Sequence, residues 1–245
     1  MQSLRFRLSL MMFLQFFIWG AFFVTMGAYL LQVFEGEESL NTIIGSAYAT
    51  HNWAGLLAPV FVGLLADRYF NAEKVNGISH LVGAVLLWTA AGITEPGTFI
   101  WVMLAYFMLY MPSLALVNAI AFANIDDPDS EFPRIRVWGT IGWIIAGFMI
   151  AGTVLGFIQI PLLSWLTGIE SNIQSTNIPL KVSAFISVLY GLYSFTLPAT
   201  PPSASGEKFD VKQALGLDAL KLLSEKNFAI FSFSSFAISI PLAFY

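Results

Sequence analysis

The sequence of 245 residues contains no cysteine and few charged residues, which make up only 11% of it. Without cysteine these residues can form no disulfide, iron–sulfur cluster or thiolate metal site. A soluble domain is about 25% charged, whereas this sequence is 57% hydrophobic, with a mean hydropathy of +0.74. A soluble protein of this size could not bury so much apolar surface. The composition therefore predicts a protein that is surrounded by lipid.

Several other patterns are missing as well. No basic stripe suggests a nucleic-acid partner. The apolar runs contain no carboxylate pair, no nucleophile beside a base and no phosphate-binding glycine loop, so the sequence does not favour an enzyme or a bound cofactor. The two histidines, His51 and His80, are too far apart in the chain to suggest a metal site. Each is interpreted as a hydrogen-bonding partner of a neighbouring helix, with proton movement as the alternative.

Apolar runs of about 20 residues, the length that a bilayer requires, recur along the chain. The first is too long for a signal-peptide core and has no small-residue cleavage site, so it is interpreted as a retained membrane helix. Polar links separate the runs and contain most of the charges. The six predicted spans are Leu8–Phe34, Thr42–Ala66, Val75–Thr94, a stretch within Gly97–Ile125, Val137–Ile158 and Leu180–Leu197.

The composition changes after the sixth run. A Pro- and Ser-rich segment and a lysine-bearing amphipathic stretch predict a cytoplasmic linker with a short interfacial helix. A seventh apolar run follows and reaches Tyr245 without a flanking polar anchor, which predicts the front part of a longer protein. The predicted domains are a six-helix bundle (1–197), the linker (198–226) and an incomplete seventh helix (227–245).

Lysine and arginine are distributed unevenly about the predicted spans. If the helices alternate in direction, ten of the eleven lie on one side and only Lys181 lies on the other. Positive residues concentrate on the cytoplasmic side of membrane proteins, so the pattern predicts a cytoplasmic N-terminus and linker. Six helices, a long basic linker and a new helix are the plan of one half of a twelve-helix transporter.

The link after the second run carries a recognisable motif, Gly63-Leu-Leu-Ala-Asp67-Arg68. It resembles the G-x-L-A-D-R/K signature of the major facilitator superfamily, in the loop where that superfamily carries it. The resemblance implies that Asp67 and Arg68 help to hold an inward gate closed. The alternative is a simple charge pair at a helix end.

Longer motifs resemble one branch of that superfamily, the nucleoside:proton symporter family of bacterial permeases. They include Phe13-Leu-Gln-Phe16 with Trp19-Gly20, Tyr110-Met-Pro112, and Phe132-Pro-Arg-Ile-Arg-Val-Trp-Gly-Thr-Ile-Gly142. The resemblance covers nearly the whole sequence. It implies an all-α transporter of the bacterial inner membrane that imports nucleosides by proton symport through alternating access. Its partners would be the nucleoside, the proton, the bilayer and a second six-helix half.

Helical spacing identifies a candidate substrate-binding stripe in the fifth run. Arg136, Gly139, Thr140 and Trp143 recur at i, i+3, i+4 and i+7 and share one face, whereas Arg134 points elsewhere. A ribose with a heterocyclic base could use the guanidinium, the hydroxyl and the aromatic ring. The alternative is that both arginines are interfacial anchors.

Two other runs carry polar and aromatic stripes. Gln15 and Trp19 lie one helical turn apart in the first run, as in the wall of a pore, and Tyr110 lies on a similar stripe of the fourth. Helix packing or a lipid-facing position is the alternative for these residues. No ionisable acid lies within the six runs away from their ends, so a proton-binding acid is expected in the second half.

The sequence leaves three alternatives open. The arginine and aromatic set also suits a pyranose, so a sugar or glycoside carrier is the alternative substrate class. A membrane sensor or scaffold that transports nothing is an alternative of another kind, as is a six-helix half that works as a homodimer.

Overall fold

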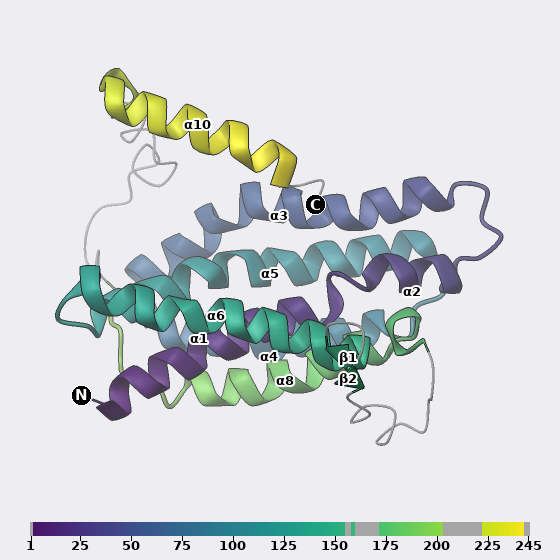
Figure 1. Cartoon of the computed structure of the whole chain (residues 1–245), viewed down its shortest axis with the longest axis horizontal. Coiled ribbons are helices and arrows are strands. Elements are labelled where there is room, and N and C mark those ends of the chain that lie inside the picture. The colour runs from purple at the N-terminus through teal and green to yellow at the C-terminus, as the bar shows by residue number, and fades with distance from the viewer. Residues whose placement is uncertain (1, 155–157, 160–171, 203–221, 243–245) are drawn as a thin grey trace. The chain divides into compact units, whose positions relative to one another are not determined.

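The computed structural model describes residues 2–154, 158–159, 172–202 and 222–242 (Figure 1). Within these, side-chain surroundings are described for 3–57, 69–152, 172–202 and 222–238. The chain divides into two compact units, Met1–Ser205 and Gly206–Tyr245.

In its described residues, the first unit is built from α-helices, with one 3-10 turn and one pair of very short strands. Its helices are α1 (Gln2–Phe22), α2 (Met26–Val33), α3 (Leu40–Arg68), α4 (Ala72–Ala90), α5 (Pro96–Ala123), α6 (Pro128–Ala151), the 3-10 turn η1 (Ile173–Ser175) and α8 (Ile178–Ser194). Strands β1 (Thr153–Val154) and β2 (Ile158–Gln159) pair antiparallel, with Thr153 opposite Gln159. The described part of the second unit contains helix α10 (Lys226–Leu242).

The prediction of a helical fold is confirmed, but two of the predicted runs differ in their details. The first run is not one helix, because α1 ends at Phe22 and α2 begins at Met26. The helix of the fifth run begins at Pro128 rather than Val137, because Pro128 and two acidic residues form a favourable first turn. It ends at Ala151 rather than Ile158, because Gly152 adopts a left-handed conformation that ends the helix. The expected linker helix and the segment around Trp165 lie outside the described residues.

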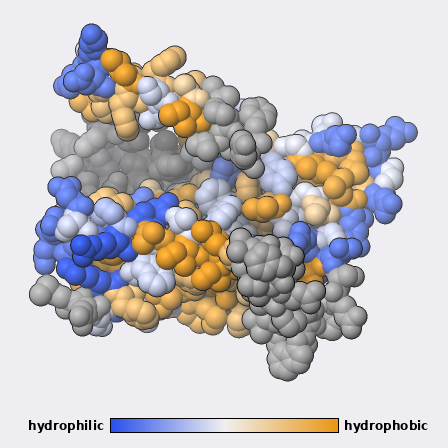
Figure 2. Space-filling view, viewed as in Figure 1, coloured by the Kyte–Doolittle hydropathy of each residue, from blue (hydrophilic) through white to orange (hydrophobic). Residues whose placement is uncertain are grey.

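Three stretches of the described residues are long and apolar enough to cross a membrane: Ser3–Val33, Pro96–Ala123 and Pro128–Ala151. The apolar helix Ile178–Ser194 is shorter. Over the Met1–Ser205 unit, Figure 2 shows hydrophobic residues across the middle of the visible face and hydrophilic residues toward its ends. Large exposed side chains such as Trp53, Trp88 and Trp101 would be costly in water, and lipid is the solvent that suits them.

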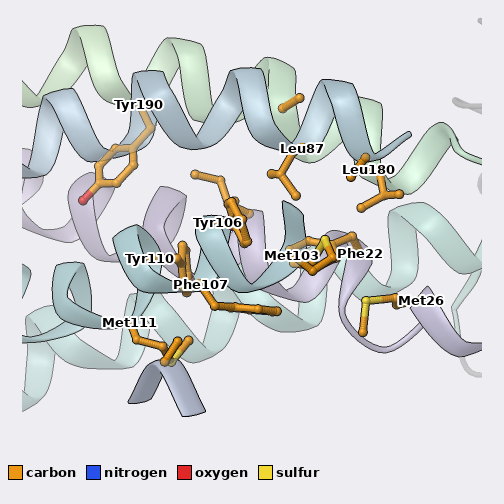
Figure 3. Close-up of a cluster of buried hydrophobic side chains, with 14 of the residues drawn as sticks. Phe22, Met26, Leu87, Met103, Tyr106, Phe107, Tyr110, Met111, Leu180 and Tyr190 are labelled. Atoms are coloured by element: carbon orange, nitrogen blue, oxygen red, sulfur yellow. The ribbon is translucent and has the colours of Figure 1, made fainter. Parts of the chain in front are cut away.

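Helices α1 and α5 form the centre of the first unit. Helix α1 packs against α6 and α8, and α5 packs against α3 and α4. Buried aromatic rings fill the space between α1 and α5: Phe22 lies 5.6 Å from Tyr106 and 6.1 Å from Phe107 between ring centroids (Figure 3). This core holds α1 against its neighbours and so positions the candidate site residues that α1 carries.

Candidate functional site

The stripe predicted on α6 lies along the contact between α6 and α1. The guanidinium carbon of Arg136 lies 4.1 Å from the centroid of the Phe16 ring, which is a cation–π contact. Arg136 is partly buried there, whereas Arg134 and Thr140 are exposed. The structure thus separates the two arginines in the way that helical spacing predicts.

Glycines allow α1 and α6 to come into close contact beside this stripe. A Cβ on Gly142 would collide with the backbone carbonyl oxygen of Phe13, and one on Gly20 would lie 2.9 Å from the carbonyl oxygen of Trp143. A Cβ on Gly139 would lie 2.7 Å from the Phe16 ring. Side chains at these three positions would force the helices apart. Their absence brings Phe16 and Trp19 of α1 beside Arg136 and Trp143 of α6.

Trp19 is the centre of an aromatic cluster that joins four helices. Its ring meets Trp143 of α6 edge to face at 5.0 Å, stacks on His51 of α3 at 5.2 Å and lies 5.9 Å from Tyr110 of α5. Its indole Nε1 is buried and has no hydrogen-bond partner among the described residues. An unpaired buried donor is the kind of polar group that a ligand can satisfy.

Gln15 and Tyr110 are buried, and their polar groups are occupied by protein partners. The Gln15 amide donates to Ser113 Oγ at 2.7 Å and meets His80 Nε2 at 2.9 Å through its Oε1. The Tyr110 hydroxyl donates to the backbone carbonyl oxygen of Gln15 at 2.7 Å. These bonds tie α1 to α4 and α5 in the buried interior, where an unpaired polar group is costly. In this structure the Tyr110 ring packs near Trp19, and Gln15 joins α1 to its neighbours one turn before Trp19.

The two histidines occupy different surroundings. His80 makes the interhelical hydrogen bond that the sequence suggested. His51 is partly exposed, and its Nδ1 lies 3.0 Å from Oδ1 of the adjacent Asn52 while its ring covers one face of Trp19. His51 was not predicted from the sequence as a residue of the substrate site. The available signal was a stripe on α3, because Tyr48, His51 and Gly55 are spaced at i, i+3 and i+7.

The predicted gating pair, Asp67 and Arg68, lies at the C-terminal end of α3. The side chains of both residues lie outside the part of the chain whose surroundings are described. Among the described residues the only salt bridge joins Arg5 Nε of α1 to Glu131 Oε2 of α6, at 2.8 Å. The same residues include no group of three His, Asp or Glu that could hold a metal ion.

Comparison with known proteins identifies the family. The sequence pattern of the family described as "Nucleoside H+ symporter" matches residues 1–245. The chain belongs to the nucleoside H+ symporter family. Its motifs in α1 and α6, which carry the candidate site, are therefore motifs of a symporter family, and the chain is part of a multi-pass membrane protein.

Relatives within the nucleoside H+ symporter family are permeases and transporters rather than enzymes. The chain is 45% identical to YegT of Escherichia coli (strain K12) over 98% of its own length and 52% of YegT. It is 32% identical to the xanthosine permease of the same organism, over 94% of the chain and 51% of the permease. It thus spans about half the length of the curated relatives that it matches.

Solved structures agree with this assignment. The crystal structure of the nucleoside transporter NupG matches with a TM-score of 0.72 at 31% identity, over 93% of the chain and 52% of NupG. A peptide transporter, POT, shares the fold with a TM-score of 0.55 at 17% identity. The observed helical arrangement is therefore that of known membrane transporters.

Proposed function

We propose that this chain forms the N-terminal six-helix bundle of a transporter that imports nucleosides by proton symport. Alternating access would move this bundle and a second bundle around a site near the middle of the membrane. A cytoplasmic linker at 198–226 and a seventh helix from 227 would follow the bundle. The protein would lie in the bacterial inner membrane, with its N-terminus in the cytoplasm. Family membership supports the reaction, and the contact between α1 and α6 supports the location of the site.

The observation that carries the proposal is the position of Arg136. Its guanidinium is held over the Phe16 ring at 4.1 Å and has no carboxylate partner among the described residues. A planar fork of donors without a protein acceptor can bind hydroxyls and ring carbonyls of a nucleoside. Thr140 lies one turn further along the same helix and is exposed. Together they present hydrogen-bonding groups at one face of α6.

The aromatic cluster supplies the rest of the proposed site. Trp143 is partly exposed and meets Trp19 at 5.0 Å, so its ring can contact a nucleobase while Trp19 holds it in place. One face of Trp19 is already covered by His51. The Trp19 Nε1 is buried and unpaired among the described residues, and it is proposed to donate to a ribose hydroxyl or a base carbonyl when a substrate enters the cluster. Tyr110 contributes by packing near Trp19, and Gln15 contributes by joining α1 to α4 and α5.

The coupling ion is proposed to be the proton, bound by an acid in the second bundle. Within the described membrane spans of the first unit, the buried Gln15 side chain is hydrogen-bonded to both Ser113 and His80. The gate at the cytoplasmic end is proposed to involve Asp67 and Arg68. A sugar carrier is the second candidate substrate class, because the Arg136 fork also suits a pyranose.

The test is uptake of labelled uridine by the full-length protein in proteoliposomes, with and without a proton gradient. Saturable uptake that collapses with the gradient is expected, and excess free sugar should not compete. Absence of saturable uptake, or uptake that does not depend on the gradient, would show that the proposal is wrong. Competition by sugar instead of nucleoside would assign the second substrate class.

Arg136 and Arg134 provide a matched pair for locating the site. Arg136→Ala should lower uptake at least tenfold, because loss of a charged hydrogen-bonding partner costs roughly 1.5–3 kcal/mol of binding. Arg134→Ala should leave uptake per inserted molecule near the wild-type value, because its side chain is exposed. Uptake is normalised to the amount of protein in the vesicles. Equal losses in the two variants would contradict the assignment of Arg136.

A further inference from the structure

The first membrane span is interrupted between α1 and α2, and a side chain from another helix occupies the interruption. Helix α1 ends at Phe22 and α2 begins at Met26. The helical pattern is regular on both sides, since the Phe23 amide donates to the Trp19 carbonyl at 3.1 Å and the Tyr29 amide donates to the Thr25 carbonyl at 3.1 Å. The irregularity is thus confined to the bonds between these two.

The Tyr48 hydroxyl of α3 stands between two groups that would bond each other in an unbroken helix. It donates to the Phe23 carbonyl oxygen at 3.0 Å and accepts from the Gly27 amide at 3.0 Å. Residues 23 and 27 are four apart, which is the spacing of an α-helical hydrogen bond. Insertion of a polar group into that bond is a known cause of sharp helix bends. The span contains no proline that could explain its interruption.

The same tyrosine also contacts the proposed site. The Tyr48 ring meets the Phe23 ring edge to face at 5.2 Å. Phe23 in turn lies 5.6 Å from Trp19 and 5.2 Å from His51, so it packs against both rings at the centre of the aromatic cluster. The bend in the first span and the wall of the site therefore share one residue, Phe23, and both of its contacts with Tyr48 are direct.

Gly27 leaves room for this arrangement. A Cβ at position 27 would lie 3.3 Å from the Tyr48 hydroxyl oxygen and 3.6 Å from its Cε2, which is tight. A larger side chain would push the hydroxyl away from the Gly27 amide. Glycine on one helix and tyrosine on the other thus act as a pair.

We propose that Tyr48 is a positioning residue for transport: its hydroxyl keeps the first membrane span bent at Phe23–Gly27. This inference rests on the proposed transport function. The hydroxyl pairs both backbone groups while the helical hydrogen bond between them is open, so the span stays bent without leaving either group unpaired in lipid. The bent span in turn serves the conformational step of transport. It does not contribute a substrate contact.

The test combines uptake kinetics with a distance measurement on the full-length protein. Tyr48→Phe removes the hydroxyl alone, so the Gly27 amide and the Phe23 carbonyl are left to bond each other and the span straightens. The maximal uridine uptake rate should fall by about fivefold or more while KM stays within about twofold, since the affected step is conformational. Gly27→Ala should also lower the maximal uridine uptake rate, but by a smaller factor.

Spin labels report the bend without depending on uptake. Cysteines at Phe6 and Leu31, which are 68% and 52% exposed, place one label on α1 and one on α2. In a background without other cysteines, the label-to-label distance should lengthen in Tyr48→Phe. The matched control is Tyr193→Phe, because the Tyr193 hydroxyl also donates to a carbonyl of α1, that of Arg7, at 3.0 Å, but within a regular turn. The Tyr193→Phe variant should change neither the label-to-label distance nor the ratio of the maximal uptake rate to KM.

The outcomes distinguish failure of the role proposed for Tyr48 from failure of the proposed transport function. An unchanged distance in Tyr48→Phe, or kinetics equal to those of Tyr193→Phe, would overturn the role of Tyr48. A wild-type protein that takes up no nucleoside would overturn the proposed function. In that case the label distances would still decide whether the hydroxyl holds the bend.

Discussion

Buried polar side chains inside this bundle differ in whether they have a hydrogen-bond partner. Gln15 is completely buried, and its amide is bonded on both sides, to Ser113 and His80. Trp19 lies one turn further along α1, and its Nε1 has no partner among the described residues. An unpaired buried donor is costly, which is the physical reason for proposing that a ligand pairs with the Trp19 Nε1.

Glu95 caps the N-terminal end of α5, and its protonation should affect the stability of the protein. Its carboxylate accepts from the amides of Gly97 at 2.8 Å and Thr98 at 2.5 Å, outside the membrane span. Hydrogen bonds from Thr98, and then from Gly97, lower the pKa of Glu95. Because the folded-state pKa is lowered, the stabilisation is present above the unfolded-state pKa and is lost as pH falls through the folded-state pKa.

We therefore expect Glu95→Gln to lower the melting temperature of the full-length protein in detergent at pH 7. The difference from wild type should shrink as the pH is lowered through the acidic range, where Glu95 itself becomes protonated. Glu35→Gln is the control, because the Glu35 carboxylate accepts no hydrogen bond among the described residues. A difference that stays constant with pH would show that the charge of Glu95 does not support the helix cap.

At the scale of whole elements, the sequence predicted where helices lie better than where they begin and bend. Hydropathy detects only apolar residues, so it missed the charged first turns of α6 before Val137. It also joined α1 and α2, because the bend depends on Tyr48, a residue of another helix that lies 21 positions beyond Gly27. Periodicity did separate Arg136 from Arg134, since that property belongs to one helix alone.

The close contact between α1 and α6 depends on glycine at specific positions, and this can be tested on one helix. Gly142→Ala should lower the melting temperature and uptake, because the new Cβ would collide with the Phe13 carbonyl oxygen. Overpacking of this kind typically costs about 1–3 kcal/mol. Gly147→Ala is the matched control, since nothing lies within 4 Å of a Cβ at that position.

In that control alanine should be neutral or stabilising by up to about 1 kcal/mol, because it favours a helix more than glycine does. Thermal unfolding of both variants, followed by tryptophan fluorescence, provides the comparison. Equal destabilisation at the two positions would indicate that helix propensity, and not the contact with α1, determines the effect of Gly142.

At the scale of the whole molecule, the candidate site is assembled from four helices, and most of it could not be predicted from one sequence. Each stripe was visible by its spacing, but the sequence does not show which stripes meet. The contact of His51 with Trp19 joins residues 32 positions apart on α1 and α3. The occupied amide of Gln15 likewise depends on residues of α4 and α5, so its burial was not evident from the chain alone.

The distribution of positive charge predicts how the molecule is oriented, and the sequence makes that prediction easy to test. Cysteine is absent from these 245 residues, so single cysteines can be introduced at the two ends of the bundle. Tyr69 in the α3–α4 link is exposed, as is Asp129 at the start of α6, and both should face the cytoplasm. Glu37 in the α2–α3 link and Thr94 in the α4–α5 link are also exposed and should face outward.

In intact cells, a membrane-impermeant maleimide should label cysteine at Glu37 and Thr94 but reach Tyr69 and Asp129 only after the membrane is permeabilised. Any native cysteines elsewhere in the full-length protein are first replaced, and uptake is checked to be retained. The reverse labelling pattern would place the N-terminus outside. It would also move the Arg5–Glu131 salt bridge, which joins the N-terminal ends of α1 and α6 at 2.8 Å, to the outer end of the bundle. The proposed cytoplasmic gate at Asp67 and Arg68 would then lie on the wrong side of the membrane.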